Sequence, residues 1–318
     1  QEPAEFGPST KSLHRRVFVT YLANCNIQIA LNSYTNFLHL CISTFSAILH
    51  LKNTITEGGL MTTYDLFLFA GQSNMAGRGI ACTQFPECAP DLIPGAGAEF
   101  RAISDPIRLY PIAEPFGALE NNLTGIFEPG MKTGSLVASF VNTYFQNTGV
   151  PVLGLSSSKG GSVIANWQDH DDYLTDTITR LKSAQTFCEQ HNITLRHQYL
   201  LWCQGESDGD HHTSADEYTK QFMQMYEKLK AVGIEHCFLI GIGSYNGTAD
   251  DICYDEIRNA QYSFAEHRKD ITVVSRLFET MKARGLMKDS FHYYQAGYNE
   301  VGKDAAVNTA KYVLTTAE

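Results

Sequence analysis

Short apolar runs alternate with longer segments of helical periodicity along most of this 318-residue chain. Each short run predicts a strand, because consecutive apolar residues bounded by turn residues are typical of strands buried on both faces. Between the runs, apolar residues recur every three or four positions, which predicts amphipathic helices. The expected strands are 64–70, 151–155, 197–203, 237–242 and 271–275, and the expected helices are 132–147, 172–191, 214–232, 253–267 and 297–315.

The alternation of strands and helices predicts an α/β fold with a parallel sheet covered on both faces. Five strands suit a three-layer αβα sandwich with a flavodoxin-like parallel five-stranded sheet, in which a site lies outside the carboxyl ends of the strands. The stretch 77–130 is rich in Pro and Gly and has no clear period. We therefore expect it to be a long surface loop near that edge.

The first sixty residues differ in composition from the rest. They contain no Asp and no Trp, and the apolar stretch 37–51 is interrupted by Ser, Thr and His. Met61 follows Glu57-Gly58-Gly59, whose codons can spell a ribosome-binding site. Our hypothesis is that residues 1–60 are an N-terminal extension that is non-native or disordered and that 61–318 is the folded domain. Mass spectrometry of the protein from its native host would test this start. A start at Met61 predicts a cytoplasmic protein, with secretion as the alternative.

The formal charge of −10 argues against nucleic acid and anionic membrane surfaces as partners, since both attract basic surfaces. No window holds the roughly 18 uninterrupted apolar residues of a membrane span. Eight cysteines include no C-x-x-C pair, and most lie in apolar runs, which predicts reduced, buried thiols. Cys82 and Cys88 share one loop-like stretch and are expected to bridge only if the protein is exported.

One polar motif follows the first predicted strand, and another lies after the last predicted strand. Ser73 lies in Gly71–Gly77 (GQSNMAG), directly after the first strand, where a serine can present its hydroxyl at the sheet edge. A polar turn or a helix N-cap is the alternative. Asp289 and His292 precede the last helix, and their spacing lets the carboxylate orient the imidazole and stabilise its protonated form. A helix cap beside a surface histidine is the alternative there.

Two further motifs follow the second and third strands. The pair Gly160-Gly161 leaves backbone N–H groups uncovered, as an oxyanion hole requires, although a flexible connection has the same composition. Gln204 leaves the end of strand 197–203, where its amide can donate to developing negative charge or simply end the strand. Together the four motifs supply a nucleophile, a base with its orienting carboxylate, and oxyanion donors. These are the parts needed for acyl transfer through a serine.

The four motifs occur in this order over residues 71–292 and resemble the sequence blocks of the SGNH hydrolase superfamily. They are most similar to its branch of sialate O-acetylesterases and carbohydrate esterase family 6 acetylxylan esterases. The resemblance implies the SGNH hydrolase fold, no cofactor and no metal. It also implies a carboxylic ester hydrolase that removes O-acetyl groups from acetylated xylan, xylo-oligosaccharides or O-acetyl sialic acid through an acetyl-enzyme intermediate.

The resemblance also implies roles for single residues. Ser73 would be the serine nucleophile, His292 the general base and Asp289 the residue that orients it. The backbone N–H groups of Ser73 and Gly161 and the side-chain amide of Gln204 would form the oxyanion hole. Archetypal members have Asn in the third block and Gly-Asp-Ser in the first, where this chain has Gln and Gly-Gln-Ser.

Less specific expectations concern the acceptor sugar. Gly160 is the second choice for the glycine donor of the oxyanion hole. Stretches 78–130 and 243–256 are expected to shape the substrate pocket. Candidate sugar contacts, each of which also suits packing or capping, are Tyr110, Asn166, Trp167 and Tyr245.

Three other functions stay open at this stage. A metal hydrolase could use the runs 169–172 (DHDD) and 208–212 (DGDHH), although Asp and His are also common as caps and solvated charges. Sensitivity to EDTA would favour it. A non-catalytic carbohydrate-binding protein of the same fold would not react with a serine-directed fluorophosphonate. A GDSL-type lipase or thioesterase would prefer longer acyl chains.

Overall fold

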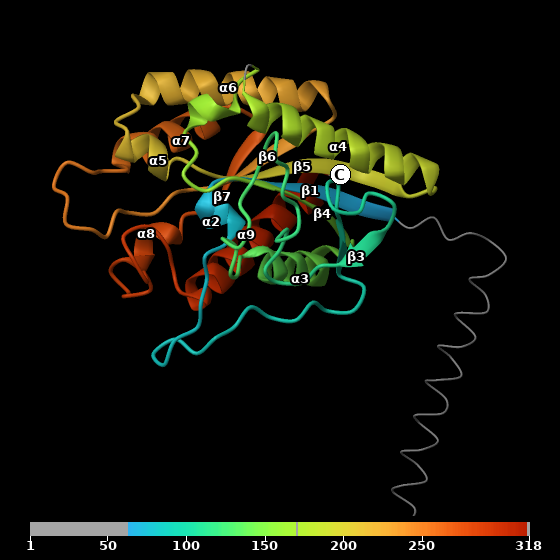
Figure 1. Ribbon diagram of the computed structural model, residues 1–318, viewed down its shortest axis with the longest axis horizontal. Helices are drawn as coiled ribbons and strands as arrows, with labels where there is room; N and C mark the ends of the chain where they lie inside the picture. The colour runs from blue at the N-terminus through green and yellow to red at the C-terminus, as the bar shows by residue number, and fades with distance from the viewer. Residues whose placement is uncertain (1–62, 170, 317–318) are drawn as a thin grey trace, which may run out of the picture. The chain divides into compact units, whose positions relative to one another are not determined.

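The computed structural model of this protein describes residues 63–169 and 171–316, and the hypothesis about residues 1–60 lies outside them. In this described part, seven strands form one sheet in the order β3-β2-β4-β1-β5-β6-β7 (Figure 1). The strands are β1 (Thr63–Gly71), β2 (Gly97–Phe100), β3 (Leu109–Pro111), β4 (Val152–Ser158), β5 (Thr194–Cys203), β6 (His236–Ile240) and β7 (Ile271–Ser275).

The five strands expected from the sequence form the centre of the sheet, and all of their pairings are parallel. Their order is that of flavodoxin, with β1 between β4 and β5. Leu68 of β1 faces Leu155 of β4 and Leu200 of β5 in this register. All three are buried, which is why each strand reads as a continuous apolar run rather than an alternating one.

Two additional strands at one side of the sheet correct the expected count of five. β2 and β3 lie in the stretch 77–130, which the sequence predicted to be a loop. β2 pairs parallel with β4, and β3 pairs antiparallel with β2. Both are short, and β2 carries a buried carboxylate, Glu99, which accepts hydrogen bonds from the Gly117 N–H at 3.1 Å and the Arg101 Nε at 2.8 Å. A charge in the middle of a short strand removes the apolar pattern by which strands are recognised.

Helices cover both faces of the sheet (Figure 1). Apolar residues of α4, α6 and α7 pack in the core of one face, and those of α3, α8 and α9 pack in the core of the other. The five long helices confirm the predicted ones to within a few residues at each end. The helices are α2 (Ser73–Ala76), α3 (Val137–Thr148), η1 (Ile164–Trp167), α4 (Asp172–Gln190), α5 (Glu206–Asp210), α6 (Ala215–Ala231), α7 (Asp255–His267), α8 (Phe278–Met281) and α9 (Gln295–Thr316).

Local sequence explains several helix ends. Gly149 ends α3 in the left-handed conformation, with φ of 70°, and its N–H donates to the Phe145 carbonyl at 2.8 Å. Ser214 begins α6 because its hydroxyl accepts the Glu217 N–H at 3.3 Å. The start of α6 agrees with the helix 214–232 expected from the sequence.

All six cysteines in the part of the chain that the structure describes are free thiols, Cys82 and Cys88 included. Cys203 and Cys237 are buried, as their apolar surroundings predicted, and burial raises the pKa of both thiols well above the usual value. No helix within the described ranges combines the length and the apolarity needed to cross a membrane.

Candidate active site

All four sequence motifs come to the carboxyl edge of the sheet, around α2 and α5 (Figure 1). A pocket of about 400 Å³ opens at this edge. The structure therefore brings the predicted nucleophile, the predicted base and the glycine pair into one cavity, although they lie up to about two hundred residues apart in the chain. The lining residues are Gln72, Ser73, Arg78, Phe127, Glu128, Pro129, Met131, Lys159, Gly160, Gly161, Glu206, Ser207, Asp210, Phe291 and His292.

Ser73 begins the short helix α2, two residues after β1 ends at Gly71. At the end of β1, Gly71 lies beside Cys203 of β5. Gly71 has φ of +137°, and a Cβ there would lie 2.0 Å from the Cys203 carbonyl oxygen. Only glycine fits at this position. The Gln72 N–H then donates to the same carbonyl at 2.9 Å. This tight turn places Ser73 at the pocket wall, where its own N–H makes no hydrogen bond to any described residue.

Asp289 and His292 form a pair in the loop before α9. The Nδ1 atom of His292 lies 3.0 Å from both carboxylate oxygens of Asp289. The N–H groups of Phe291 and His292 also donate to Asp289, at 2.8 and 2.7 Å. The carboxylate thus holds both the ring and its loop, and His292 lines the pocket.

Burial and hydrogen bonding set the charges of this pair. Burial works to raise the pKa of Asp289, but hydrogen bonds from Phe291, Lys288 and His292 outweigh it and hold the pKa at about 2. Burial lowers the pKa of His292, and the nearby charges of Lys288 and Arg78 add to this against the opposing effect of Asp289. At neutral pH the site therefore holds an ionised carboxylate and a neutral imidazole that can accept a proton.

The two glycines of the predicted oxyanion hole differ in their partners. The Gly160 N–H donates to the Glu128 carboxylate at 2.7 Å. The Gly161 N–H donates to none of the described residues, and Gly161 adopts φ of +71° at the pocket wall. Gly161 is therefore the glycine whose N–H is available to a ligand, and Gly160 is not.

Gln204 lies beneath the pocket rather than in its wall. Its side chain is fully buried, and its Nε2 donates to the Ser162 carbonyl at 2.9 Å and to the Asp208 carboxylate. Both amide hydrogens are used by these two acceptors. This corrects the expectation of a side-chain donor to the oxyanion: Gln204 instead holds Ser162, the residue after the glycine pair. A sequence motif does not reveal which of two acceptors an amide meets.

Asn74 joins three of the motifs and was not singled out by the sequence. Its Nδ2 donates to Glu206 at 2.6 Å and to the Phe291 carbonyl at 3.1 Å, while its Oδ1 accepts the Tyr298 hydroxyl at 2.6 Å. Burial raises the pKa of Glu206 to about 7, because the hydrogen bond from Asn74 only partly offsets the loss of solvent. Asn74 thus fixes the loop that carries His292 against α2.

None of the expected sugar contacts lines the pocket. Trp167 is fully buried, with its ring 5.1 Å from that of Trp202 and its Nε1 donating to the Ser162 hydroxyl at 3.1 Å, so it has no surface to offer a ligand. The Asn166 side chain accepts the Val163 N–H at 3.0 Å. These positions correct the expectation for both residues, which build the η1 turn.

The two tyrosines also lie outside the lining. Tyr245 is half-buried behind Phe291, with ring centroids 5.7 Å apart. Tyr110 lies on the edge strand β3, with the Arg101 guanidinium 3.9 Å from its ring centroid. Tyr245 supports a pocket residue from behind, whereas Tyr110 is part of the sheet edge.

Side chains outside the predicted site residues complete the pocket, several of them from the segment 127–131. The rim is apolar and exposed: Phe127 is 41%, Met131 54% and Phe291 37% accessible. The wall beside Ser73 is charged, because the Arg78 guanidinium pairs with Glu128 at 2.6 Å and both are buried. The only signal for this rim in the sequence is that Phe127 and Met131 flank Pro129 and Gly130 in a segment without periodicity.

The two acidic runs that suggested a metal have structural partners. Asp208 is buried and accepts the Ile164 N–H at 3.0 Å, and Asp210 accepts the Tyr254 hydroxyl at 2.8 Å. His211 contacts the Ser207 carbonyl through Nδ1 at 2.7 Å, and Asp169 pairs with Lys228 at 2.8 Å. Over the ranges 63–169 and 171–316, no group of three or more His, Cys, Asp or Glu residues is arranged to hold a metal ion.

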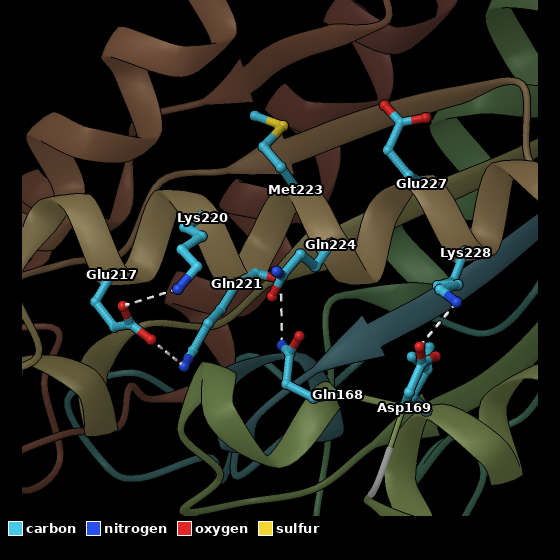
Figure 2. Close-up of a pocket in the computed structure, with 10 residues that line it drawn as sticks. Gln168, Asp169, Glu217, Lys220, Gln221, Met223, Gln224, Glu227 and Lys228 are labelled. Carbon is cyan, nitrogen blue, oxygen red and sulfur yellow. Dashed lines mark hydrogen bonds and ion pairs between the residues drawn. The ribbon is translucent and has the colours of Figure 1, made fainter.

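A larger hollow of about 620 Å³ lies between η1 and the outer face of α6 (Figure 2). Its polar side chains bind one another: Lys228 pairs with Asp169, and the Gln168 Nε2 donates to the Gln221 carbonyl at 3.2 Å. Among the described residues that line it, no nucleophile lies beside a base. The smaller pocket at the carboxyl edge is therefore the candidate active site.

The fold, together with four motifs in this order at one sheet edge, defines an ester hydrolase of the SGNH class. The chain belongs to the carbohydrate esterase family of sialic acid-specific acetylesterases, whose sequence model matches residues 63–311. The protein is therefore a carbohydrate esterase that acts on O-acetyl groups. No curated protein sequence matches the chain.

Solved structures agree with this fold. A protein from Arabidopsis thaliana is similar, with a TM-score of 0.57 and 19% identity over 79% of this chain and 98% of that one. NanS is similar with a TM-score of 0.54 and 14% identity over 80% and 98%. A carbohydrate acetylesterase from Xanthomonas citri has a TM-score of 0.50 and 16% identity over 80% and 57%.

Proposed function

We propose that the protein removes O-acetyl groups from sugars by a serine mechanism, with Ser73 as nucleophile, His292 as general base and Asp289 as the residue that orients it. The observation that carries the proposal is one pocket lined by Ser73 and His292, with Asp289 bonded to the far side of the imidazole. A general base needs a neutral imidazole, here hydrogen-bonded to an ionised carboxylate.

In the proposed first step, the Nε2 of His292 takes the proton of the Ser73 hydroxyl as its oxygen attacks the acetyl carbonyl carbon. The N–H groups of Ser73 and Gly161 stabilise the oxyanion. The C–O bond to the sugar then breaks, and His292 gives its proton to the leaving sugar oxygen. His292 next takes a proton from water as the water oxygen attacks the acetyl carbonyl carbon. The bond from that carbon to the Ser73 oxygen then breaks, and His292 returns its proton to this oxygen, which frees the serine and releases acetic acid that ionises to acetate.

The shape and charge of the pocket favour a short acyl group on a larger alcohol. The wall beside Ser73 is formed by the charged pair Arg78–Glu128. A long hydrocarbon chain laid against this wall would displace water from the charges without gaining apolar contacts there. The apolar side chains of Phe127, Met131 and Phe291 lie at the rim. Exposed apolar patches beside a pocket mark ligand surfaces, and the C–H face of a sugar ring fits this one.

The test is acetate release from acetylated xylan, acetylated xylo-oligosaccharides and O-acetyl sialic acid, measured side by side with 4-nitrophenyl esters of increasing chain length. Wild-type protein should release acetate from at least one sugar and should discriminate against longer acyl chains. Ser73→Ala should lose at least about 10³-fold in kcat with the fold intact, since the nucleophile is gone. Near wild-type turnover by Ser73→Ala would refute the nucleophile, and a preference for long acyl chains would point to a lipase.

A further inference from the structure

One carboxylate outside the four motifs lies directly against the glycine turn of the pocket. Glu128 comes from the segment between β3 and α3, and its Oε1 accepts the Gly160 N–H at 2.7 Å and the Arg78 Nη2 at 2.6 Å. The Lys159 ammonium is 4.0 Å from the same oxygen. Glu128 is buried, and its Oε2 has no hydrogen-bond partner among the described residues. One oxygen therefore carries all of these contacts.

Gly160 has no room for a side chain because this carboxylate fills the space. A Cβ at Gly160 would lie 2.5 Å from the Glu128 Oε1, 2.6 Å from the Arg78 Nη2 and 3.3 Å from the Ser73 Cβ. The carboxylate, the guanidinium and the wall that carries the nucleophile thus meet at one residue. A small shift of Glu128 would open this contact.

The other end of the glycine turn is also held. The Ser162 carbonyl accepts the Gln204 amide at 2.9 Å, and the Ser162 hydroxyl accepts the Trp167 ring N–H at 3.1 Å. Gly161 lies between the two held residues. Adjacent glycines populate many backbone conformations, so an unheld pair would turn its N–H groups in several directions. The bonds to Gly160 and Ser162, together with the Lys159 ammonium that donates to the Gly160 carbonyl at 3.3 Å, restrict the directions that the Gly161 N–H can take.

We propose that Glu128 is a positioning residue for the oxyanion hole: it holds the Gly160 N–H so that the next N–H, that of Gly161, faces the acetyl oxyanion. This inference rests on the proposed function. A carboxylate suits the task because hydrogen bonds to an ionised acceptor are roughly twice as strong as neutral ones. The role is indirect, since Glu128 acts through the glycine turn and not on the substrate.

Two substitutions separate position from charge. Glu128→Asp keeps the charge but withdraws the acceptor from Gly160, and it should lower kcat by about 10- to 100-fold, part of the effect of losing an oxyanion donor. KM should change by no more than about twofold, since the ground-state carbonyl uses the hole weakly. Glu128→Gln keeps the reach and loses the charge, so it should lower kcat by less than Glu128→Asp does, because a neutral acceptor still holds the Gly160 N–H but more weakly. Affinity for a boronic acid, which forms a tetrahedral adduct with the serine, should fall in parallel with kcat and should fall further in Glu128→Asp.

The opposite order would overturn the proposal, because a slow Glu128→Gln beside an active Glu128→Asp would mean that neutralising Arg78 is what matters. Equal rates in both variants, either fast or slow, would overturn it as well. The matched control is Glu120→Asp, a buried carboxylate of the same segment that accepts the Ile103 N–H at 2.9 Å away from the pocket. It should lower the thermal midpoint and leave kcat unchanged.

Fluorophosphonate labelling of the wild-type enzyme keeps the two proposals apart. If Ser73 is not labelled, the serine mechanism itself fails. If Ser73 is labelled and Glu128→Asp turns over at the wild-type rate, only the role of Glu128 fails.

Discussion

His292 is the residue whose protonation state decides whether the site is active. Its pKa is lowered first by burial and then by the charges of Lys288 and Arg78, against the opposing pull of Asp289. A base must be neutral to accept a proton, so activity is present above this pKa and lost as the pH falls through it.

We therefore expect the acid limb of kcat/KM to have its midpoint below pH 6.5, the ordinary value for histidine. The measurement is kcat/KM against pH for 4-nitrophenyl acetate and for an acetylated xylo-oligosaccharide. Both substrates should give the same midpoint because kcat/KM reports the free enzyme. An acid limb above pH 6.5, or one that differs between the substrates, would contradict the assignment.

Asp289 supports that residue from behind. Its carboxylate raises the pKa of His292, so Asp289→Asn should move the remaining acid limb to lower pH. The turnover number should fall by about 10³- to 10⁴-fold, because the ring loses the acceptor that fixes its tautomer. Turnover and its pH profile are measured together. Unchanged turnover in Asp289→Asn would show that the loop alone orients the ring.

At the scale of elements, the junction of β1 and α2 is the strictest part of the site. The Gln72 side chain reaches across it, and its Oε1 accepts the N–H groups of Gly205 at 3.1 Å and Ser207 at 3.3 Å. The first motif therefore fixes the loop that follows β5. The junction of β1 and α2 depends on Gly71, which lies against the Cys203 carbonyl of β5.

Gly71→Ala should lower the free energy of unfolding by at least about 3 kcal/mol, since it combines a strained backbone conformation with a clash. The control is Gly149→Ala, where φ is +70°, in the left-handed region, and nothing lies within 4 Å of the new Cβ; it should cost about 1 kcal/mol. Urea unfolding measures both. Equal losses in the free energy of unfolding for the two variants would mean that the close contact of Gly71 with β5 adds no cost.

At the scale of the whole molecule, the two ends of the sheet have different roles, one in catalysis and one in stability. The carboxyl end carries the pocket, whereas the amino end of β1 carries a buried charge cluster around Asp65. The Arg196 Nε donates to Asp65 at 2.8 Å, and the Tyr144 hydroxyl donates to it at 2.5 Å. This cluster ties β1 to β5 and α3, so it should matter for stability and not for catalysis.

Asp65→Ala removes one partner of this buried group and should lower the free energy of unfolding by about 3 kcal/mol. The Michaelis parameters, measured well below the thermal midpoint, should stay unchanged because the cluster lies at the far end of β1 from Ser73. Thermal unfolding and steady-state kinetics check the two halves of this prediction. A fall in kcat without a loss of stability would show that the ends are coupled.

The sequence by itself determined the central five strands and the long helices, since periodicity and turn residues act locally. It also placed Ser73, Gly161 and the Asp289–His292 pair at strand ends, and parallel strands bring such ends to one edge. Tertiary structure alone decided the strands β2 and β3, the Arg78–Glu128 wall and the partners of Gln204. These depend on where a segment without periodicity returns to the sheet and on which acceptor a buried amide meets. Contacts between residues far apart in the chain leave no local pattern.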